Sequence, residues 1–181
     1  GRTPSIRLSD FGRRQAAQLA DALAGSGLSA LYSSPMQRAL ETAQPLAERL
    51  GLSVRPHDAF HEIEFGDWSN RTLEELERNG EWKLFNTFRS NVRIPNGETM
   101  LDVQTRFVRG IQALCVQREG QTVAVFSHSD PIKTALAFYL GMPLDLFERL
   151  EIHPASVSIL NVYPWGVRLR CINAVWVDPA D

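Results

Sequence analysis

Short apolar runs alternate with longer amphipathic stretches along most of this chain. Three short runs, "LSALYSS", "LSVRP" and "TVAVFS", are predicted strands, and "TVAVFS" is nearly all apolar, as in a strand covered by helices on both faces. Apolar positions at helical spacing predict helices between and after them, over residues 10–24, 36–50, 97–119, 131–142 and 143–150. This alternation predicts an α/β fold, a three-layer α/β/α sandwich around a mostly parallel sheet.

Capping residues and turn residues set the predicted ends of these elements. Ser9 is a good N-cap for the first helix, Ser34 caps the second ahead of Pro35, and Asn96 is suited to cap the third. The closing stretch "SVSILNVYPWGVRLRCINAVWV" predicts two strands joined by a Pro-Trp-Gly turn.

Residues 57–96 break the alternation with irregular, polar and aromatic sequence. Helices are expected there only around "TLEELERN" and "EWKLFNTF". The aromatic side chains of Trp68, Trp82, Phe85 and Phe88 fit either the wall of a substrate pocket or a core. We expect residues 1–181 to form one domain, with 57–96 as an excursion over one sheet edge near the active site.

Composition limits the classes of partner. The chain has 181 residues, 44% hydrophobic and 22% charged, with a net charge of −2, which excludes a disordered chain and gives no basic field for nucleic acid. No apolar run reaches the roughly 18 residues of a membrane span, and "GRTPSIRLSD" lacks the apolar core of a signal peptide. Cys115 and Cys171 are interpreted as buried, reduced thiols, so we expect a cytoplasmic protein. Because the chain has no basic field, we expect its partner to be a small solute.

Two predicted helix N-termini follow strands, where open α/β sheets bind ligands. Ser34 opens one helix with Arg38 in its first turn, and Ser129 opens another directly after His128. Fork-shaped donors, a histidine and backbone dipoles together suit a dianionic phosphate. Taken alone, Arg38 also fits a surface pair with Glu41, and His128 fits a capping or core histidine.

A third candidate is the stretch "FHEIEFGDWSN". Its carboxylates Glu62 and Glu64 alternate with Ile63 and Phe65, and we expect one of the two to face a pocket. A carboxyl group that faces an aromatic pocket has a raised pKa and suits general-acid catalysis. The alternative is a solvated acidic loop.

These segments together resemble the histidine phosphatase superfamily, in its phosphoglycerate-mutase-like branch. The resembling segments, in order, are "LSDFGRRQAAQLADAL", "SSPMQRALETA", "HEIEFGDWSN", "PNGETMLDVQTR" and "VAVFSHSDPIK". The resemblance implies that Arg38, His128 and the N–H of Ser129 bind the transferring phosphoryl group and that Glu62 is the proton donor. It implies no metal and no cofactor, and a small phosphorylated metabolite as substrate; a homodimer is left open.

The chain departs from the family pattern in three places. Ser129 and Asp130 follow His128 where many members have two glycines, and Asn70 stands at a usual glycine. The Arg-His-Gly motif, which ends the family's first strand and carries the nucleophilic histidine, does not occur. We therefore expect about twenty residues upstream of Gly1 to supply this normally central strand, and the chain as given to be inactive and poorly folded.

Several activities remain to be separated. A phosphatase is favoured over a phosphoglycerate mutase, because no long basic insertion is evident between Glu62 and Pro95. An inactive phosphate-binding pseudoenzyme in the same fold is the alternative from another class. A metal hydrolase that uses His57, His61 and Glu62 is weaker, because "HDAFHE" is not His-Glu-x-x-His. A serine hydrolase lacks its Gly-x-Ser-x-Gly elbow.

Overall fold

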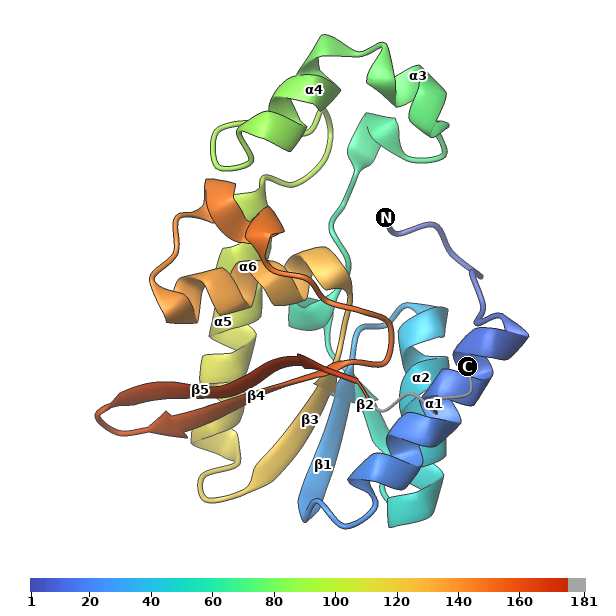
Figure 1. The fold of residues 1–181 in the computed structure, drawn as a ribbon, viewed down its shortest axis with the longest axis vertical. Helices are drawn as coiled ribbons and strands as arrows, with labels where there is room; N and C mark the ends of the chain where they lie inside the picture. The colour runs from blue at the N-terminus through green and yellow to red at the C-terminus, as the bar shows by residue number, and fades with distance from the viewer. Residues whose placement is uncertain (176–181) are drawn as a thin grey trace.

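Three parallel strands form the central sheet of the structure, a computed structural model that describes residues 1–175 (Figure 1). They run in the order β2-β1-β3, with bounds β1 (Leu28–Ser33), β2 (Val54–Pro56) and β3 (Thr122–Phe126). In the register of the sheet, Tyr32 of β1 stands between Arg55 of β2 and Val125 of β3. All three strands were predicted from the sequence.

Helices cover both faces of this sheet, as a three-layer sandwich requires (Figure 1). The covering helices are α1 (Asp10–Leu23), α2 (Gln37–Leu50), α5 (Met100–Gln117) and α6 (Ser129–Leu140). Successive residues of β1 point to opposite faces: Leu31 packs in the core formed with α1 and α2, whereas Ala30 and Tyr32 pack in the core formed with α5 and α6. The predicted α/β sandwich is confirmed. Across residues 1–175, no helix is both long and apolar enough to cross a membrane.

Some predicted helix boundaries were wrong. Ser9 does cap α1, but α5 is capped by Thr99, whose hydroxyl accepts from the N–H of Asp102 at 3.0 Å. Asn96 instead has a φ of 55° and donates through Nδ2 to the Asp67 carboxylate at 3.0 Å. A capping box, with side chain and backbone bonded reciprocally, satisfies more free N–H groups than a single cap, so the helix begins after Thr99. The helix predicted over 143–150 is the 3₁₀ helix η3 (Leu144–Arg149).

The excursion over 57–96 begins beside the sheet, where Phe60 joins the core, and rises to α3 and α4 at the top of Figure 1. Its elements are η1 (Asp58–Phe60), η2 (Gly66–Trp68), α3 (Leu73–Glu77) and α4 (Gly80–Thr87). Trp68 and Phe85 are buried in one cluster with residues of α5, α6 and η3, and Trp82 packs against that cluster. Phe88 is 45% exposed. These aromatic side chains therefore serve chiefly as the core of the excursion.

Arg89 fastens this excursion to the helix that follows β3. Its guanidinium is 4.3 Å from the ring centroid of Phe85 and 5.1 Å from that of Phe147. One amino group donates to Glu148 at 2.7 Å, and the other lies 3.6 Å from Asp130 in α6. Because the side chain is only 9% exposed, this cation is held by carboxylates and aromatic faces rather than by water.

The predicted closing strands form a sheet of their own. β4 (Val157–Tyr163) and β5 (Gly166–Ala174) pair antiparallel around the expected turn, but within residues 1–175 they pair with none of the other strands. β3, expected to be buried on both faces, pairs only with β1 there, and Phe126 is its one fully buried residue. Trp176 and Val177, at the end of the predicted second strand, lie outside the described residues.

Candidate active site

The structure brings together three of the predicted site residues, each from a different segment. Arg38 lies in the first turn of α2, after β1; His128 is the N-cap of α6, after β3; and Glu62 lies in the excursion. The Glu62 carboxylate is 3.4 Å from a guanidinium nitrogen of Arg38 and 3.6 Å from Nδ1 of His128. The fourth predicted residue, Ser129, opens α6 beside them.

Arg38 makes no surface pair with Glu41. The Glu41 carboxylate instead accepts from the N–H of Leu8 at 2.8 Å and from the side chain of Gln37 at 2.9 Å, next to the start of α1. Arg38 turns the other way, toward Glu62, with its side chain 23% exposed. The alternative that explained Arg38 as an exposed ion pair is therefore wrong.

His128 is buried, and a serine hydroxyl holds its ring. Its Nε2 lies 2.8 Å from Oγ of Ser34, which has no exposed surface and also accepts from the N–H of Met36 at 3.2 Å. Burial, with the positive charge of Arg38 next in importance, lowers the pKa of His128 to about 3. The imidazole is therefore neutral at pH 7. Sequence reasoning assigned Ser34 only a capping role and missed this contact.

The carboxyl group of Glu62 is 15% exposed and sits between a base and a cation. Burial raises its pKa, an effect partly offset by the N–H of Ile63, which donates to it at 3.0 Å. Glu64, two residues on, points instead toward Arg2, at 3.7 Å. The two acidic side chains diverge because the segment that carries them is not a regular strand, in which residues two apart would share a face. Glu62 is the one that can exchange a proton within the cluster.

Gly1 lies inside the same cluster. Its carbonyl accepts from the guanidinium of Arg38 at 3.1 Å, and a Cβ on it would meet the ring of Phe65 at 2.7 Å. The backbone of this residue is thus packed between the proposed phosphate ligand and the excursion.

Asp130 adds an unforeseen acidic group to the first turn of α6. Burial raises the pKa of this carboxyl, and the charge of Arg89, 3.6 Å away, opposes the rise. The negative charge of Asp130 also contributes to the raised pKa of Glu62. Asp130 thus stands where the family resemblance leads one to expect glycine, and Arg89 of the excursion balances its negative charge.

The residues of the metal-hydrolase alternative do not form a ligand set. His57 uses its Nδ1 to accept from the N–H of Ala59 at 3.1 Å, which caps η1. Throughout the described part of the chain, no three His, Cys, Asp or Glu side chains gather as metal ligands would. The geometry therefore lends that alternative no support.

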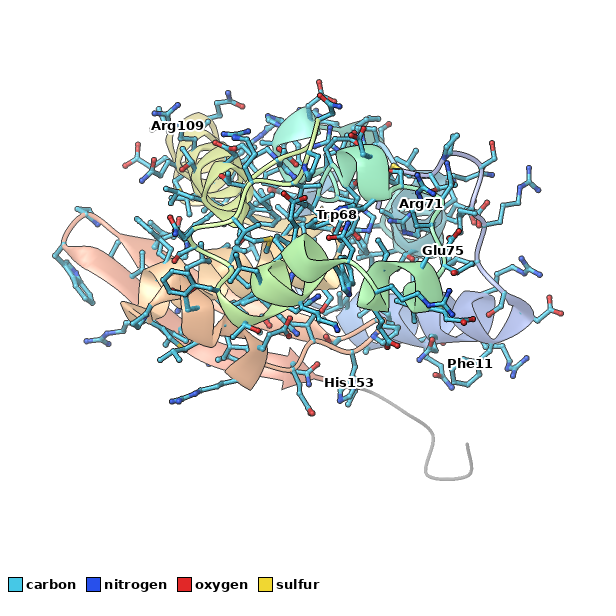
Figure 2. The ribbon with its side chains drawn as sticks, turned by 90° about the horizontal axis from the view of Figure 1, so that it is seen from above. Phe11, Trp68, Arg71, Glu75, Arg109 and His153 are labelled. Atoms are coloured by element: carbon cyan, nitrogen blue, oxygen red, sulfur yellow. The ribbon has the colours of Figure 1, made fainter. Side chains whose placement is uncertain are left out.

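A separate cavity of about 380 Å³ opens in the excursion. Trp68, Arg71 and Glu75, which Figure 2 labels close together, belong to its lining. Neither Arg38, Glu62 nor His128 lines it. All of its lining residues lie within 67–95, so the cavity belongs to the excursion itself and is separate from the three clustered side chains.

Comparison with known proteins identifies the family. A sequence model described as histidine phosphatase superfamily (branch 1) matches residues 1–175. The chain belongs to this superfamily. The resemblance of the five sequence segments is thereby confirmed.

The relatives of this chain include enzymes named for phosphoryl chemistry. Phosphoserine phosphatase 1 of Hydrogenobacter thermophilus is 32% identical over 86% of this chain and 74% of its own length. A 2,3-bisphosphoglycerate-dependent phosphoglycerate mutase of Thermoplasma acidophilum is 31% identical over 86% of this chain and 74% of its length. The bifunctional protein Rv2228c of Mycobacterium tuberculosis is 37% identical over 92% of this chain, but this match spans only 46% of that protein.

Solved structures share the fold over nearly the whole chain. Bacillus stearothermophilus YhfR has a TM-score of 0.89 and 26% identity, covering 97% of this chain and 90% of that one. A mycobacterial glucosyl-3-phosphoglycerate phosphatase, solved with inorganic phosphate, has a TM-score of 0.83 and 28% identity, covering 96% and 92%. The family is thus one of phosphatases and mutases with this α/β fold.

Proposed function

We propose that the protein hydrolyses a small phosphomonoester through a phosphohistidine intermediate, without a metal ion, and that the nucleophilic histidine lies upstream of Gly1. The observation that carries this proposal is the cluster of Arg38, Glu62 and His128, in which the Glu62 carboxylate lies 3.4 Å from Arg38 and 3.6 Å from His128. The carbonyl of Gly1 is bonded to Arg38. A histidine that precedes Gly1 would therefore reach the cluster, where an attacking imidazole is required.

The central sheet supports the same proposal. Within the described residues, β3 is paired on one edge only, and the β4-β5 hairpin forms a separate sheet. An upstream strand that ends at Gly1 would satisfy the free N–H and C=O groups of β3 and complete the burial of its half-exposed side chains. We accordingly propose that residues 1–181 and this strand make one domain, with 57–96 as its excursion.

Each clustered residue then has a role in the transfer. Arg38, neutral His128 and the N–H of Ser129 at the start of α6 bind the phosphoryl oxygens and stabilise the charge that they carry in transfer. The upstream imidazole attacks phosphorus as the P–O bond breaks, and Glu62 gives its proton to the leaving oxygen. Water then attacks the phosphohistidine, the P–N bond breaks, and the Glu62 carboxylate takes a proton from that water.

The named relatives include phosphatases and a mutase, so a mutase is the second candidate. Phosphoserine phosphatase 1 and the phosphoglycerate mutase are about equally similar to this chain, at 32% and 31% identity. The two activities share the phosphohistidine and differ only in whether water or a bound product accepts the phosphoryl group. The clustered residues serve both reactions, so the acceptor has to be found by experiment.

The experiment uses the protein with its native residues upstream of Gly1. We expect turnover of at least one member of a panel of phosphorylated metabolites in the presence of a chelator, and an acid-labile phosphohistidine upstream of Gly1, located by peptide mapping after an acid-free quench. Label on His128, full activity of the chain that starts at Gly1, or strict dependence on a divalent ion would contradict the proposal. Transfer only between positions of phosphoglycerate would identify a mutase.

A further inference from the structure

The motif "PNGETMLDVQTR" contributes a side chain, Arg106, that reaches the backbone of the proton donor Glu62. Arg106, on α5, donates to three carbonyl groups of the segment that carries Glu62. The distances are 2.9 Å to Ala59, 2.7 Å to His61 and 3.0 Å to Glu62 itself. Arg106 thus bonds to both ends of the four residues 59–62, and the Glu62 carbonyl also accepts from Nε of Arg2 at 2.7 Å.

Glu98, from the same motif, holds this guanidinium in place. Its two carboxylate oxygens accept from Nε and Nη2 of Arg106, at 2.8 and 3.1 Å, in a bidentate pair. The same carboxylate accepts from Arg2 at 2.9 Å and from the N–H of Glu64 at 2.9 Å. Burial acts to raise the pKa of Glu98, but the hydrogen bonds from Arg106 and from Glu64 prevail and lower it. Glu98 is thus ionised and joins both sides of Glu62.

The Glu62 side chain depends on this backbone support. Its contact to Arg38 is long, at 3.4 Å, and the one to His128 is 3.6 Å, so neither fixes the carboxyl group firmly. The backbone, by contrast, is packed closely: a Cβ on Gly97, beside Glu98, would lie 2.4 Å from the Glu64 carbonyl oxygen. The geometry around Glu62 is therefore set mainly through its main chain.

We propose that Arg106 and Glu98 are positioning residues that hold Glu62 at the leaving oxygen, an inference that rests on the proposed function. Their removal should leave phosphate binding intact, because neither side chain has a contact with Arg38 or His128. A misplaced Glu62 should slow only those reactions in which the leaving oxygen needs a proton. A purely structural role would instead weaken every step alike.

The test compares Arg106→Lys with Arg109→Lys, in the protein that carries its upstream residues. Lysine keeps the charge but cannot serve three carbonyls and a carboxylate at once. Arg109 is a matched control, since it is exposed on the same helix and points outward in Figure 2. kcat/KM is measured on an alkyl phosphate and on a nitrophenyl phosphate, with the inhibition constant of inorganic phosphate as the third readout.

We expect Arg106→Lys to lower kcat/KM on the alkyl phosphate about 100-fold, the cost of a misplacement near 1 Å. On the nitrophenyl phosphate, whose leaving group needs no proton, the loss should stay below about threefold. The phosphate inhibition constant and Arg109→Lys should be unchanged. If Arg106→Lys fails to fold, Glu98→Gln takes its place with the same expectation.

Other outcomes separate this inference from the function on which it rests. Equal losses on both substrates, or a weakened affinity for phosphate, would overturn the positioning role while leaving the phosphatase assignment in place. A wild-type protein that turns over neither substrate nor any phosphorylated metabolite would overturn the proposed function, and the positioning role with it.

Discussion

The buried imidazole of His128 should make the protein lose stability in mild acid. Its pKa is lowered to about 3, whereas the unfolded chain binds this proton near the ordinary value of 6.5. Between these two values the unfolded state binds more protons than the folded state, so stability is present above pH 6.5 and is lost as the pH falls toward 3.

The size of the loss follows from the shift. At about 1.4 kcal/mol per pKa unit, the 1.5 units between pH 6.5 and pH 5 amount to roughly 2 kcal/mol of unfolding free energy. The side chain is only 6% exposed, so solvent screening takes little from this figure. The charged groups around it are Arg38, Glu62, His61 and Arg106, and the two arginines act in the same direction as burial.

Urea unfolding at pH 7 and pH 5, without phosphate, tests this linkage. In His128→Asn the fall in unfolding free energy between the two pH values should be smaller than in wild type by about 2 kcal/mol. His153→Asn is the control, because that side chain is 56% exposed and lies at the periphery in Figure 2. If the fall is the same in wild type and in His128→Asn, the buried neutral state of His128 is wrong.

Three further substitutions test the site and its packing. Arg38→Lys should lower kcat/KM about 100-fold or more, because an ammonium group cannot replace the paired donors of a guanidinium on phosphate. Glu41→Gln is the control and should have little effect. Equally small effects of both substitutions would contradict the role of Arg38. Glu62→Gln should lower kcat on an alkyl phosphate by about 100-fold or more and leave kcat on a nitrophenyl phosphate nearly unchanged. Glu64→Gln is the control; a larger effect of this substitution would assign the role of proton donor to Glu64. Gly97→Ala should lower the unfolding free energy by about 1–3 kcal/mol in chemical denaturation, because its Cβ would stand 2.4 Å from the carbonyl oxygen of Glu64; an unchanged midpoint would contradict that close approach.

Local patterns were sufficient to predict the strands, most helices and the three clustered residues. Each rests on a short-range rule: apolar runs for β1 and β3, Ser9 as a cap, and strand ends followed by helix N-termini for Arg38 and His128. The alternation of carboxylates with apolar residues indicated only that Glu62 or Glu64 would face a pocket, and the family resemblance assigned this place to Glu62. These features depend on periodicity and on backbone groups near in sequence, which a sequence displays directly.

Contacts between distant residues were not predictable in the same way. Ser34 and His128 are 94 positions apart, and no local pattern marks the hydrogen bond between them. The contacts of Arg106 with the segment before Glu62 span 44 to 47 positions. For these, the quoted motif "PNGETMLDVQTR" was a signal, but it gave no partner. The division of the strands into two sheets depends on pairing between edges, which apolar runs do not specify.

The anchorage of Arg89 restricts how loops can be exchanged between members of the superfamily. Segment 57–96 could be exchanged as a unit between relatives. However, Arg89 in this segment supplies the positive charge that pairs with Asp130 in α6 and with Glu148 in η3. A chimera that receives a relative's loop without an equivalent cation would keep Asp130 in a buried position with no positive partner from the loop, a costly arrangement for a carboxylate. Loop grafting in this protein therefore has to move three positions together, and Arg89, Asp130 and Glu148 should be inherited as a set.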